Sequence, residues 1–221
     1  MIDFQKYEAV IFDMDGVLID SEPLWKIAME QTFNEIGCNL TKNDFQKTVG
    51  LRIDEVITYW FNHIGWNGVS EKEVENRIIQ RMVSLIEENG KPLPGVVDTL
   101  QVLKKLGVKI GLATSSYTVL VAAVLRTLKI EDAFHFVHSA EHEQYGKPHP
   151  AVYLTVAENL GVLPTKCLVI EDSLNGIIAG KAAKMTVICI PEVTHNLEPK
   201  LIIADYHYQS MVELHQDLIK L

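Results

Sequence analysis

Two aspartates separated by one residue form the first candidate site of the chain. Asp13 and Asp15 follow the apolar run at residues 9–12, which predicts a buried parallel strand. Open α/β sheets bind ligands beyond the carboxyl ends of their strands. Two carboxylates placed there repel each other unless a proton or a cation offsets the repulsion. The pair therefore favours a divalent metal and a division of labour between nucleophile and acid, with a turn rich in Asp and Gly as the alternative.

A second acid pair stands at the end of another apolar run. Glu171 and Asp172 follow residues 167–170, and Ser173 behind them is a candidate helix N-cap. Hard divalent cations prefer oxygen ligands, which both carboxylates supply at the sheet edge that also carries Asp13. Taken alone, the pair could instead be the negative charge that stabilises a helix N-terminus.

Hydroxyl side chains end a third apolar run. Thr114, Ser115 and Ser116 follow residues 110–113, and a helical pattern begins near Tyr117. We expect Ser115 or Ser116 to be the N-cap of that helix. The free N–H groups and the positive dipole end of a helix N-terminus suit a phosphate group. A capping role without a ligand is the alternative.

A lysine lies in a stretch that proline keeps out of helical geometry. Pro148 restricts Lys147, and Pro150 restricts His149 and then fits the first turn of the next helix. Such a stiff loop can hold the Lys147 ammonium group in one place. A solvated lysine in a Pro-rich loop is the alternative.

These motifs stand at the ends of segments that alternate between strand and helix patterns. The alternation predicts right-handed βαβ units, and hence an α/β fold with a doubly wound parallel sheet. A short run near residues 204–208 could add an edge strand. The expected strands are residues 8–12, 108–114, 135–138, 167–171 and 186–190, and the expected helices are residues 96–106, 118–129, 151–161, 174–184 and 210–221.

One interval breaks the alternation. Residues 17–91 contain no convincing strand, and the stretch at 71–89 has the clearest helical spacing of apolar residues. A helical insert of ~75 residues is too long for a simple crossover. It predicts an all-helical cap domain at residues 17–91, inserted into a core formed by residues 1–16 and 92–221. The expected cap helices are residues 22–36, 43–48, 53–64 and 71–89.

The composition limits the classes of function. The chain has 221 residues, 48% of them hydrophobic, and a formal net charge of −9. This charge argues against nucleic acid as a partner, because phosphate backbones require basic patches. No stretch reaches the ~20 apolar residues of a membrane span, and the first residues lack a signal-peptide core, so we expect a soluble cytoplasmic protein. The three cysteines have no CxxC spacing, which disfavours zinc and a disulfide framework.

The ordered motifs resemble those of the haloacid dehalogenase superfamily, in particular its subgroup of β-phosphoglucomutases and sugar-phosphate phosphatases. The resemblance spans nearly the whole chain. It implies a core with a helical cap and a Mg²⁺-dependent phosphomonoesterase that acts on small hexose or hexitol phosphates. The matching segments are IFDMDGVLIDSEPLW (11–25), VGLRIDEV (49–56), LPGV (93–96), GLATSS (111–116), KPHPAVYL (147–154) and EDSLNGIIAGKAAKM (171–185).

Together with the needs of phosphoryl transfer, the resemblance assigns roles to the motifs. Asp13 is the expected nucleophile, which forms an aspartyl-phosphate, and Asp15 is the expected general acid and base. One Mg²⁺ is expected per chain, held by Asp13, the backbone carbonyl of Asp15 and Asp172, with Glu171 helping directly or through water. The groups expected to hold the phosphoryl oxygens are Thr114, the N–H of Ser115, and Lys147.

The cap is expected to supply specificity by closing over the site. Arg52 is the best candidate for a substrate contact, with a surface ion pair as the alternative. Trp25 is expected to face the mouth of the site or to pack within the cap. β-Phosphoglucomutases carry a His on the first cap helix where this chain has Trp25. A mutase-type phosphotransferase is therefore the less favoured alternative.

A function of another class also fits some of these residues. Signalling receiver modules combine a phosphorylatable Asp, an acid pair, a Thr or Ser, and a Lys on a doubly wound sheet. The presence of Asp15, the motif order and the helical insert disfavour this class, and phosphate release in excess over protein would exclude it. We also expect a monomer, because the cap must open and close, and a small sugar phosphate as the partner rather than nucleic acid or membrane.

Overall fold

A parallel sheet organises the computed structural model, which describes residues 2–48, 51–191 and 199–220. Within these residues the strand order is β3-β2-β1-β4-β5-β6, and every pairing is parallel. The order reverses between β1 and β4, which creates the crevice where such sheets bind ligands. The doubly wound α/β fold predicted from the sequence is thus confirmed. The strands are β1 (Ala9–Phe12), β2 (Lys109–Thr114), β3 (Phe136–Ser139), β4 (Cys167–Glu171), β5 (Thr186–Cys189) and β6 (Tyr206–His207).

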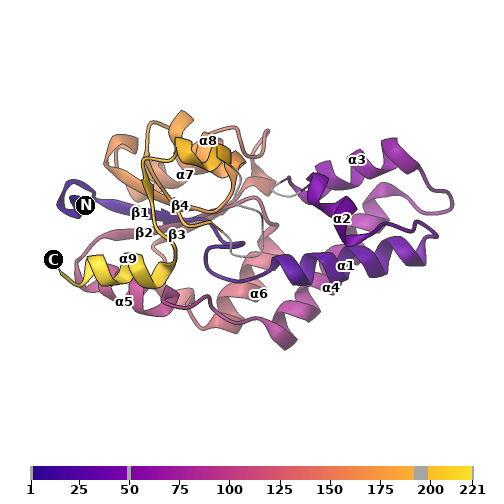
Figure 1. Cartoon of the computed structure of the whole chain (residues 1–221), viewed down its shortest axis with the longest axis horizontal. Coiled ribbons are helices and arrows are strands. Elements are labelled where there is room, and N and C mark those ends of the chain that lie inside the picture. Colours follow the sequence, from indigo (N-terminus) through magenta and orange to yellow (C-terminus); the bar gives the residue numbers. More distant parts are fainter. Residues whose placement is uncertain (1, 49–50, 192–198, 221) are drawn as a thin grey trace.

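Helices cover both faces of the sheet (Figure 1). One layer contains α5 (Val96–Lys105), α6 (Thr118–Leu128) and α9 (Met211–Leu218), and the other contains α7 (Ala151–Leu160) and α8 (Leu174–Ala182). Because strand side chains alternate, β1 serves both layers. Val10 and Phe12 belong to the hydrophobic cluster of the first layer, and Ala9 and Ile11 belong to that of the second. Each of these side chains is buried, which explains the uninterrupted apolar run.

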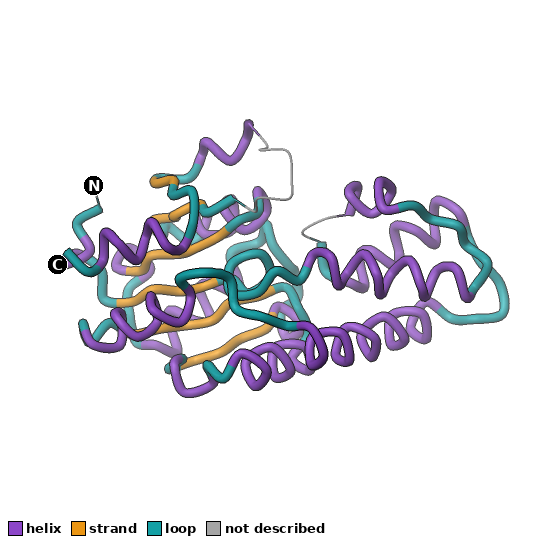
Figure 2. The backbone as a smooth tube through the Cα atoms, turned by 60° about the horizontal axis from the view of Figure 1, so that its bottom comes forward, coloured by secondary structure: helices purple, strands orange, loops and turns teal. Residues whose placement is uncertain are grey.

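The helices between β1 and α5 lie beyond the carboxyl ends of the strands (Figures 1 and 2). They are α1 (Glu22–Glu35), α2 (Lys42–Phe45), α3 (Ile53–Ile64) and α4 (Glu71–Asn89). In α4, Ser70 caps the first turn by accepting a hydrogen bond from Glu73 N, and Val74, Ile78 and Met82 form a buried stripe against α1 and α3. The all-helical insert is confirmed, whereas the domain boundaries at 16/17 and 91/92 stay a prediction.

The two connections between the sheet and these helices run side by side. Ile19 on the outward connection bridges Pro92 on the return connection, and Leu93 N donates to Leu18 O at 2.9 Å. Apolar residues of the insert and of the sheet also belong to one continuous buried cluster. The helical insert is therefore packed onto the sheet layer and not attached by a single extended linker.

The start of α6 differs from the sequence prediction. Its N-cap is Tyr117, in an extended conformation, and neither Ser115 nor Ser116 caps it. The Ser116 hydroxyl is engaged elsewhere, as a donor to Asp15, which explains the difference. Short 3-10 helices complete the described chain: η1 (Phe4–Lys6), η2 (Gln46–Thr48), η3 (Glu131–Ala133), η4 (Ala140–His142), η5 (Pro164–Lys166) and η6 (Pro199–Ile203).

No helix among the residues described in the structure combines the length and apolar character needed to cross a membrane.

Candidate active site

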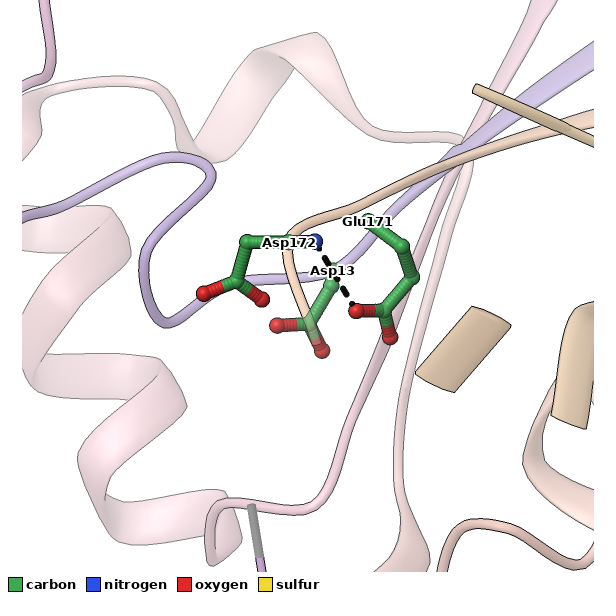
Figure 3. A group of neighbouring side chains, drawn as sticks. All are labelled: Asp13, Glu171 and Asp172. Atoms are coloured by element: carbon green, nitrogen blue, oxygen red, sulfur yellow. Dashed lines mark hydrogen bonds between the residues drawn. The ribbon is translucent and has the colours of Figure 1, made fainter. Parts of the chain in front are cut away.

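The two acid pairs predicted from the sequence meet at the reversal of strand order. Asp13 follows β1, Glu171 ends β4, and Asp172 follows it, so neighbouring strands bring the three carboxylates together (Figure 3). One oxygen from each lies within 4.8 Å of the others. Asp13 and Glu171 are buried, at 7% and 0% exposure. Such crowding of negative charge needs compensation by positive charge.

Lys147 supplies part of that compensation. Its Nζ donates to Asp13 Oδ1 at 2.5 Å, to Glu171 Oε1 at 2.7 Å and to the carbonyl oxygen of Ala113 at 3.0 Å. The side chain is almost fully buried. The lysine is thus the centre of a buried network. The alternative interpretation, a solvated lysine in a Pro-rich loop, does not hold.

The network gives its members unequal proton affinities. Burial raises the pKa of Asp13 to about 7, assisted by the charges of Glu171 and Asp15 against the attraction of Lys147. Burial alone would lower the pKa of Lys147, but the two carboxylates hold this pKa above its ordinary value. For Glu171, the attraction of Lys147 outweighs burial and lowers the pKa. Asp13 is thus the group most in need of a further cation.

Glu171 has hydrogen-bond partners at both of its oxygens. The Tyr153 hydroxyl donates to Oε1 at 2.6 Å, next to Lys147. Oε2 accepts from the N–H groups of Asp172 and Ser173 at 3.1 Å and from the Ser173 hydroxyl at 3.0 Å. Ser173 also caps α8, as the sequence predicted. Tyr153 was missed, because its place within α7 gives no sign that it reaches β4.

Asp15 stands apart from this network and has donors of its own. The hydroxyls of Ser21 and Ser116 donate to Oδ1 at 2.5 Å and to Oδ2 at 2.6 Å, and the Trp25 indole N–H donates to Oδ1 at 3.3 Å. Ser21 precedes α1 and Trp25 lies on it, whereas Ser116 follows β2. Asp15 is therefore held between the helical insert and the sheet.

These groups open onto one cavity. Its floor is formed by the carboxylates of Asp13, Asp15 and Asp172, by Lys147, and by Thr114 and Ser115 at the end of β2. The Thr114 hydroxyl oxygen accepts from Ser116 N at 3.1 Å, which fixes the turn after β2. The structure thus gathers the sequence-predicted site residues of the core around this cavity, except Glu171, which does not line it and contacts Lys147 instead.

The wall opposite this floor comes from the helical insert. It is mainly apolar, with Thr48 as a polar member and Glu22 as its charged member; the apolar residues are Trp25, Met29, Phe45, Leu51, Ile53 and Val56. Glu22 pairs with Lys26 at 3.1 Å. Trp25 faces the site, which is one of the two placements predicted from the sequence; the other is packing within the cap.

Arg52 is not one of the described residues that line the cavity. Its guanidinium group instead donates to the backbone carbonyls of Ala140 and Glu143 and pairs with Asp54. Its expected contact with the substrate stays a prediction. Gly50, which belongs to the same motif, lies outside the described residues.

The acidic cluster fits a hard divalent cation. Carboxylate oxygens are the donors such an ion prefers, and their spacing allows several to reach one centre. The geometry at Gly16 agrees with a site at this position. Its φ is +75°, and a Cβ atom there would lie 2.1 Å from Asp172 Oδ2. The backbone after Asp15 thus approaches Asp172 as closely as only glycine permits.

Comparison with known proteins agrees with this geometry. A family of haloacid dehalogenase-like hydrolases matches residues 10–190. Hexitol phosphatase B of Escherichia coli K12 is 43% identical over 93% of both chains, and a phosphorylated carbohydrates phosphatase of Thermotoga maritima is 34% identical over 80% of this chain and 81% of that protein. A mutant of CbbY from Rhodobacter sphaeroides, solved with xylulose-1,5-bisphosphate, superposes with a TM-score of 0.87 at 25% identity over 94% and 96% of the chains. The chain therefore belongs to the haloacid dehalogenase-like hydrolases, and its relatives include phosphatases that it matches over nearly its whole length.

Proposed function

We propose that the protein is a Mg²⁺-dependent phosphomonoesterase that hydrolyses monophosphates of small uncharged sugars, such as hexose and hexitol phosphates. The observation that carries this proposal is the shared cavity: Asp13, Asp15 and Lys147 face it together, with Thr114 and Ser115 beside them. Phosphoryl transfer needs a nucleophile, a proton donor and neutralisation of the phosphoryl oxygens, and these residues supply all of them.

In the proposed reaction, a carboxylate oxygen of Asp13 attacks phosphorus and the sugar oxygen departs. Asp15 gives its proton to that oxygen, so an aspartyl-phosphate and a neutral alcohol result. Asp15, now ionised, takes a proton from the attacking water in the second step, which releases phosphate and restores Asp13. The hydroxyls of Ser21 and Ser116 hold Asp15 at the cavity for both steps.

Lys147, the Thr114 hydroxyl and the Ser115 N–H would hold the phosphoryl oxygens, since all three residues line the floor. A bound Mg²⁺ would supply additional positive charge for the attacking carboxylate and the phosphoryl group. Asp13, Asp172 and the carbonyl of Asp15 are the groups proposed to hold it. Glu171 is proposed to contribute through its buried charge, because its oxygens already have partners.

The charge of the cavity supports an uncharged leaving group. Among the described residues that line it, Lys147 is the only basic side chain, and it is committed to the reacting end. Glu22 adds a carboxylate to the opposite wall, where it pairs with Lys26. A second phosphate or a carboxylate on the substrate would meet no basic side chain among the described residues that line this wall. The substrates named for the phosphatase relatives, hexitols and phosphorylated carbohydrates, agree with this inference.

The test is phosphate release by the purified protein from a panel of hexitol and hexose monophosphates, a pentulose bisphosphate and phosphoglycolate, with and without Mg²⁺. We expect sustained turnover with Mg²⁺, and values of kcat/KM ~100-fold higher for the uncharged sugars, because like charges in a site are strongly unfavourable. The Asp13→Asn variant is the inactive control.

Phosphate release limited to one equivalent would instead support a receiver-type module. Isomerisation of a sugar phosphate without net phosphate release would support a mutase. Equal or better use of the bisphosphate would contradict the proposed substrate class.

A further inference from the structure

The side chain of Arg52 reaches from the helical insert to the loop that leads to Lys147. It is the N-cap residue of α3, and its side chain is 15% exposed. Its Nη1 donates to the carbonyl oxygens of Ala140 at 3.2 Å and of Glu143 at 3.3 Å, while Nη2 pairs with Asp54 at 3.0 Å. These contacts span the boundary between the insert and the sheet layer.

The segment at residues 140–147, whose carbonyl oxygens accept the hydrogen bonds of Arg52, is also held in place by other contacts. The Glu143 carboxylate oxygen Oε1 accepts from the Thr155 hydroxyl at 2.6 Å and lies 2.8 Å from His138 Nε2. Thr155 belongs to α7 and His138 to β3. The guanidinium of Arg52 thus completes the attachment of this segment on the side that faces the insert.

Gly146 shows how closely Arg52 is fitted. This buried glycine directly precedes Lys147, and a Cβ atom on it would lie 2.9 Å from Arg52 Cδ and 3.0 Å from Cγ. The first distance is shorter than real Cβ contacts and the second is tighter than most of them, so a larger residue at 146 must displace the arginine side chain. The stem of Arg52 therefore packs on the backbone that positions the catalytic ammonium group.

The backbone of Arg52 is equally fixed on the insert. Its N–H donates to Glu55 Oε2 at 3.0 Å, and its carbonyl accepts from Val56 N at 2.9 Å. The residues on either side, Leu51 and Ile53, line the cavity wall. One side chain thereby links the wall of the cavity to the loop that carries Lys147.

We propose that Arg52 is a positioning residue that latches the helical insert onto the 140–147 segment, and so sets the distance between Lys147 and the cavity wall. The kinetic test of this inference rests on the proposed function, because it measures hydrolysis of phosphate esters. It assigns to Arg52 a role that does not involve touching the substrate. Lys147 neutralises charge that grows in the transition state, so the latch acts mainly on kcat.

The first test compares Arg52→Met with the wild-type enzyme on two substrates, a hexitol phosphate and the small ester methyl phosphate. The latch predicts that kcat falls ~10-fold or more for both, because charge-assisted hydrogen bonds to the loop are lost whatever the leaving group. A loss confined to the hexitol phosphate, or confined to KM, would overturn the latch and make Arg52 a substrate ligand.

The second test uses Gly146→Ala, which displaces Arg52 without removing it, with Gln144→Ala as the matched control on the exposed part of the same loop. Gly146→Ala is expected to lower kcat in the wild-type background and to have little further effect when combined with Arg52→Met, because both changes break one interaction. Additive effects of the two substitutions would contradict the proposal.

A readout independent of catalysis separates this inference from the proposed function. Amide hydrogen exchange within residues 140–147 is expected to accelerate in Arg52→Met, with exchange of the β1 and β4 amides unchanged. If the wild-type protein hydrolyses no phosphate ester, the proposed function fails, and the exchange experiment still tests the latch. Unchanged exchange in residues 140–147 would overturn the latch even in an active phosphatase.

Discussion

At the residue scale, several carboxylates of the site lie close together, and the ammonium group of Lys147 offsets part of their negative charge. Asp13 is buried beside Glu171, and Lys147 bridges them. Lys147 lowers the pKa of Glu171, whereas burial and the neighbouring negative charge raise the pKa of Asp13 to about 7. The carboxylate proposed as the nucleophile must be ionised to attack, so a bound divalent cation would both activate Asp13 and displace its proton.

This proton exchange predicts that Mg²⁺ affinity depends on pH. A carboxyl group with a raised pKa binds its proton below that pKa, so protons compete with the metal on the acid side of about pH 7. Titration calorimetry should show apparent affinity rising ~10-fold between about pH 6 and about pH 8, with proton release on binding. In Asp13→Asn the affinity should be weaker and independent of pH. A constant affinity in the wild-type protein would contradict this assignment.

A second prediction concerns the indole N–H of Trp25, which donates to Asp15 Oδ1 at 3.3 Å. Trp25→Phe keeps an aromatic ring but removes the donor, so Asp15 should be less well placed and kcat should fall ~5-fold, the effect of one such hydrogen bond. The matched control is Trp66→Phe, which removes a donor to Val69 O that is remote from Asp15. Equal kcat values for Trp25→Phe and the wild-type protein would show that the hydrogen bond has no role in turnover.

The sequence identified the charged residues of the site better than their partners. Asp13, Lys147 and Asp172 could be named because each stands at the end of a recognisable strand or in a proline-restricted loop. The Ser116 donor to Asp15 could not be named, because it meets that carboxylate across 101 positions of the chain. Hydroxyl residues near a strand end also suggest helix caps, so their type alone does not distinguish the two roles.

At the scale of elements, the turn after β1 decides how the proposed metal ligands approach one another. Its glycine, Gly16, has a positive φ, and the position of its absent Cβ is taken by the Asp172 carboxylate. The apolar strands and the helical periodicity could be read from the sequence. The N-cap of α6 was placed wrongly, because the serine expected to cap it binds Asp15 instead.

Gly16→Ala is therefore expected to disrupt the proposed metal site. The new methyl group would meet Asp172 Oδ2 at 2.1 Å, and Mg²⁺-dependent kcat/KM should fall by ~100-fold or more, since misplaced ligands lose charge stabilisation in the transition state. Gly37→Ala is the matched control: Gly37 has a similar φ of +80°, but a Cβ atom there would meet no atom of the described residues within 4 Å. Similar activity losses in the two variants would assign the effect to backbone strain and contradict the steric argument.

At the scale of the whole molecule, the insert and the sheet together enclose the site. The insert supplies an apolar wall and two donors to Asp15, and the sheet supplies the charged floor. The break in strand and helix alternation predicted the insert from the sequence. How the insert sits on the sheet could not be predicted, because it depends on contacts such as that of Arg52 with Ala140, which are 88 positions apart.

A single chain supplies the whole proposed site, so activity should not require association. Light scattering coupled to size-exclusion chromatography, with and without Mg²⁺, should give a mass near 24.9 kDa, and specific activity should not change on dilution. An obligate dimer, or activity that falls on dilution, would contradict the monomer that we expect.

In the proposed reaction, the carboxylate of Asp13 becomes transiently phosphorylated during turnover. The most direct measurement is rapid acid quenching of the Mg²⁺-loaded enzyme during turnover of a hexitol phosphate, followed by borohydride reduction of the acyl-phosphate and peptide mapping by mass spectrometry. Residue 13 is expected to be converted from aspartate to homoserine, and only when substrate is present. Reduction at another residue, or no reduction under conditions of steady turnover, would contradict it.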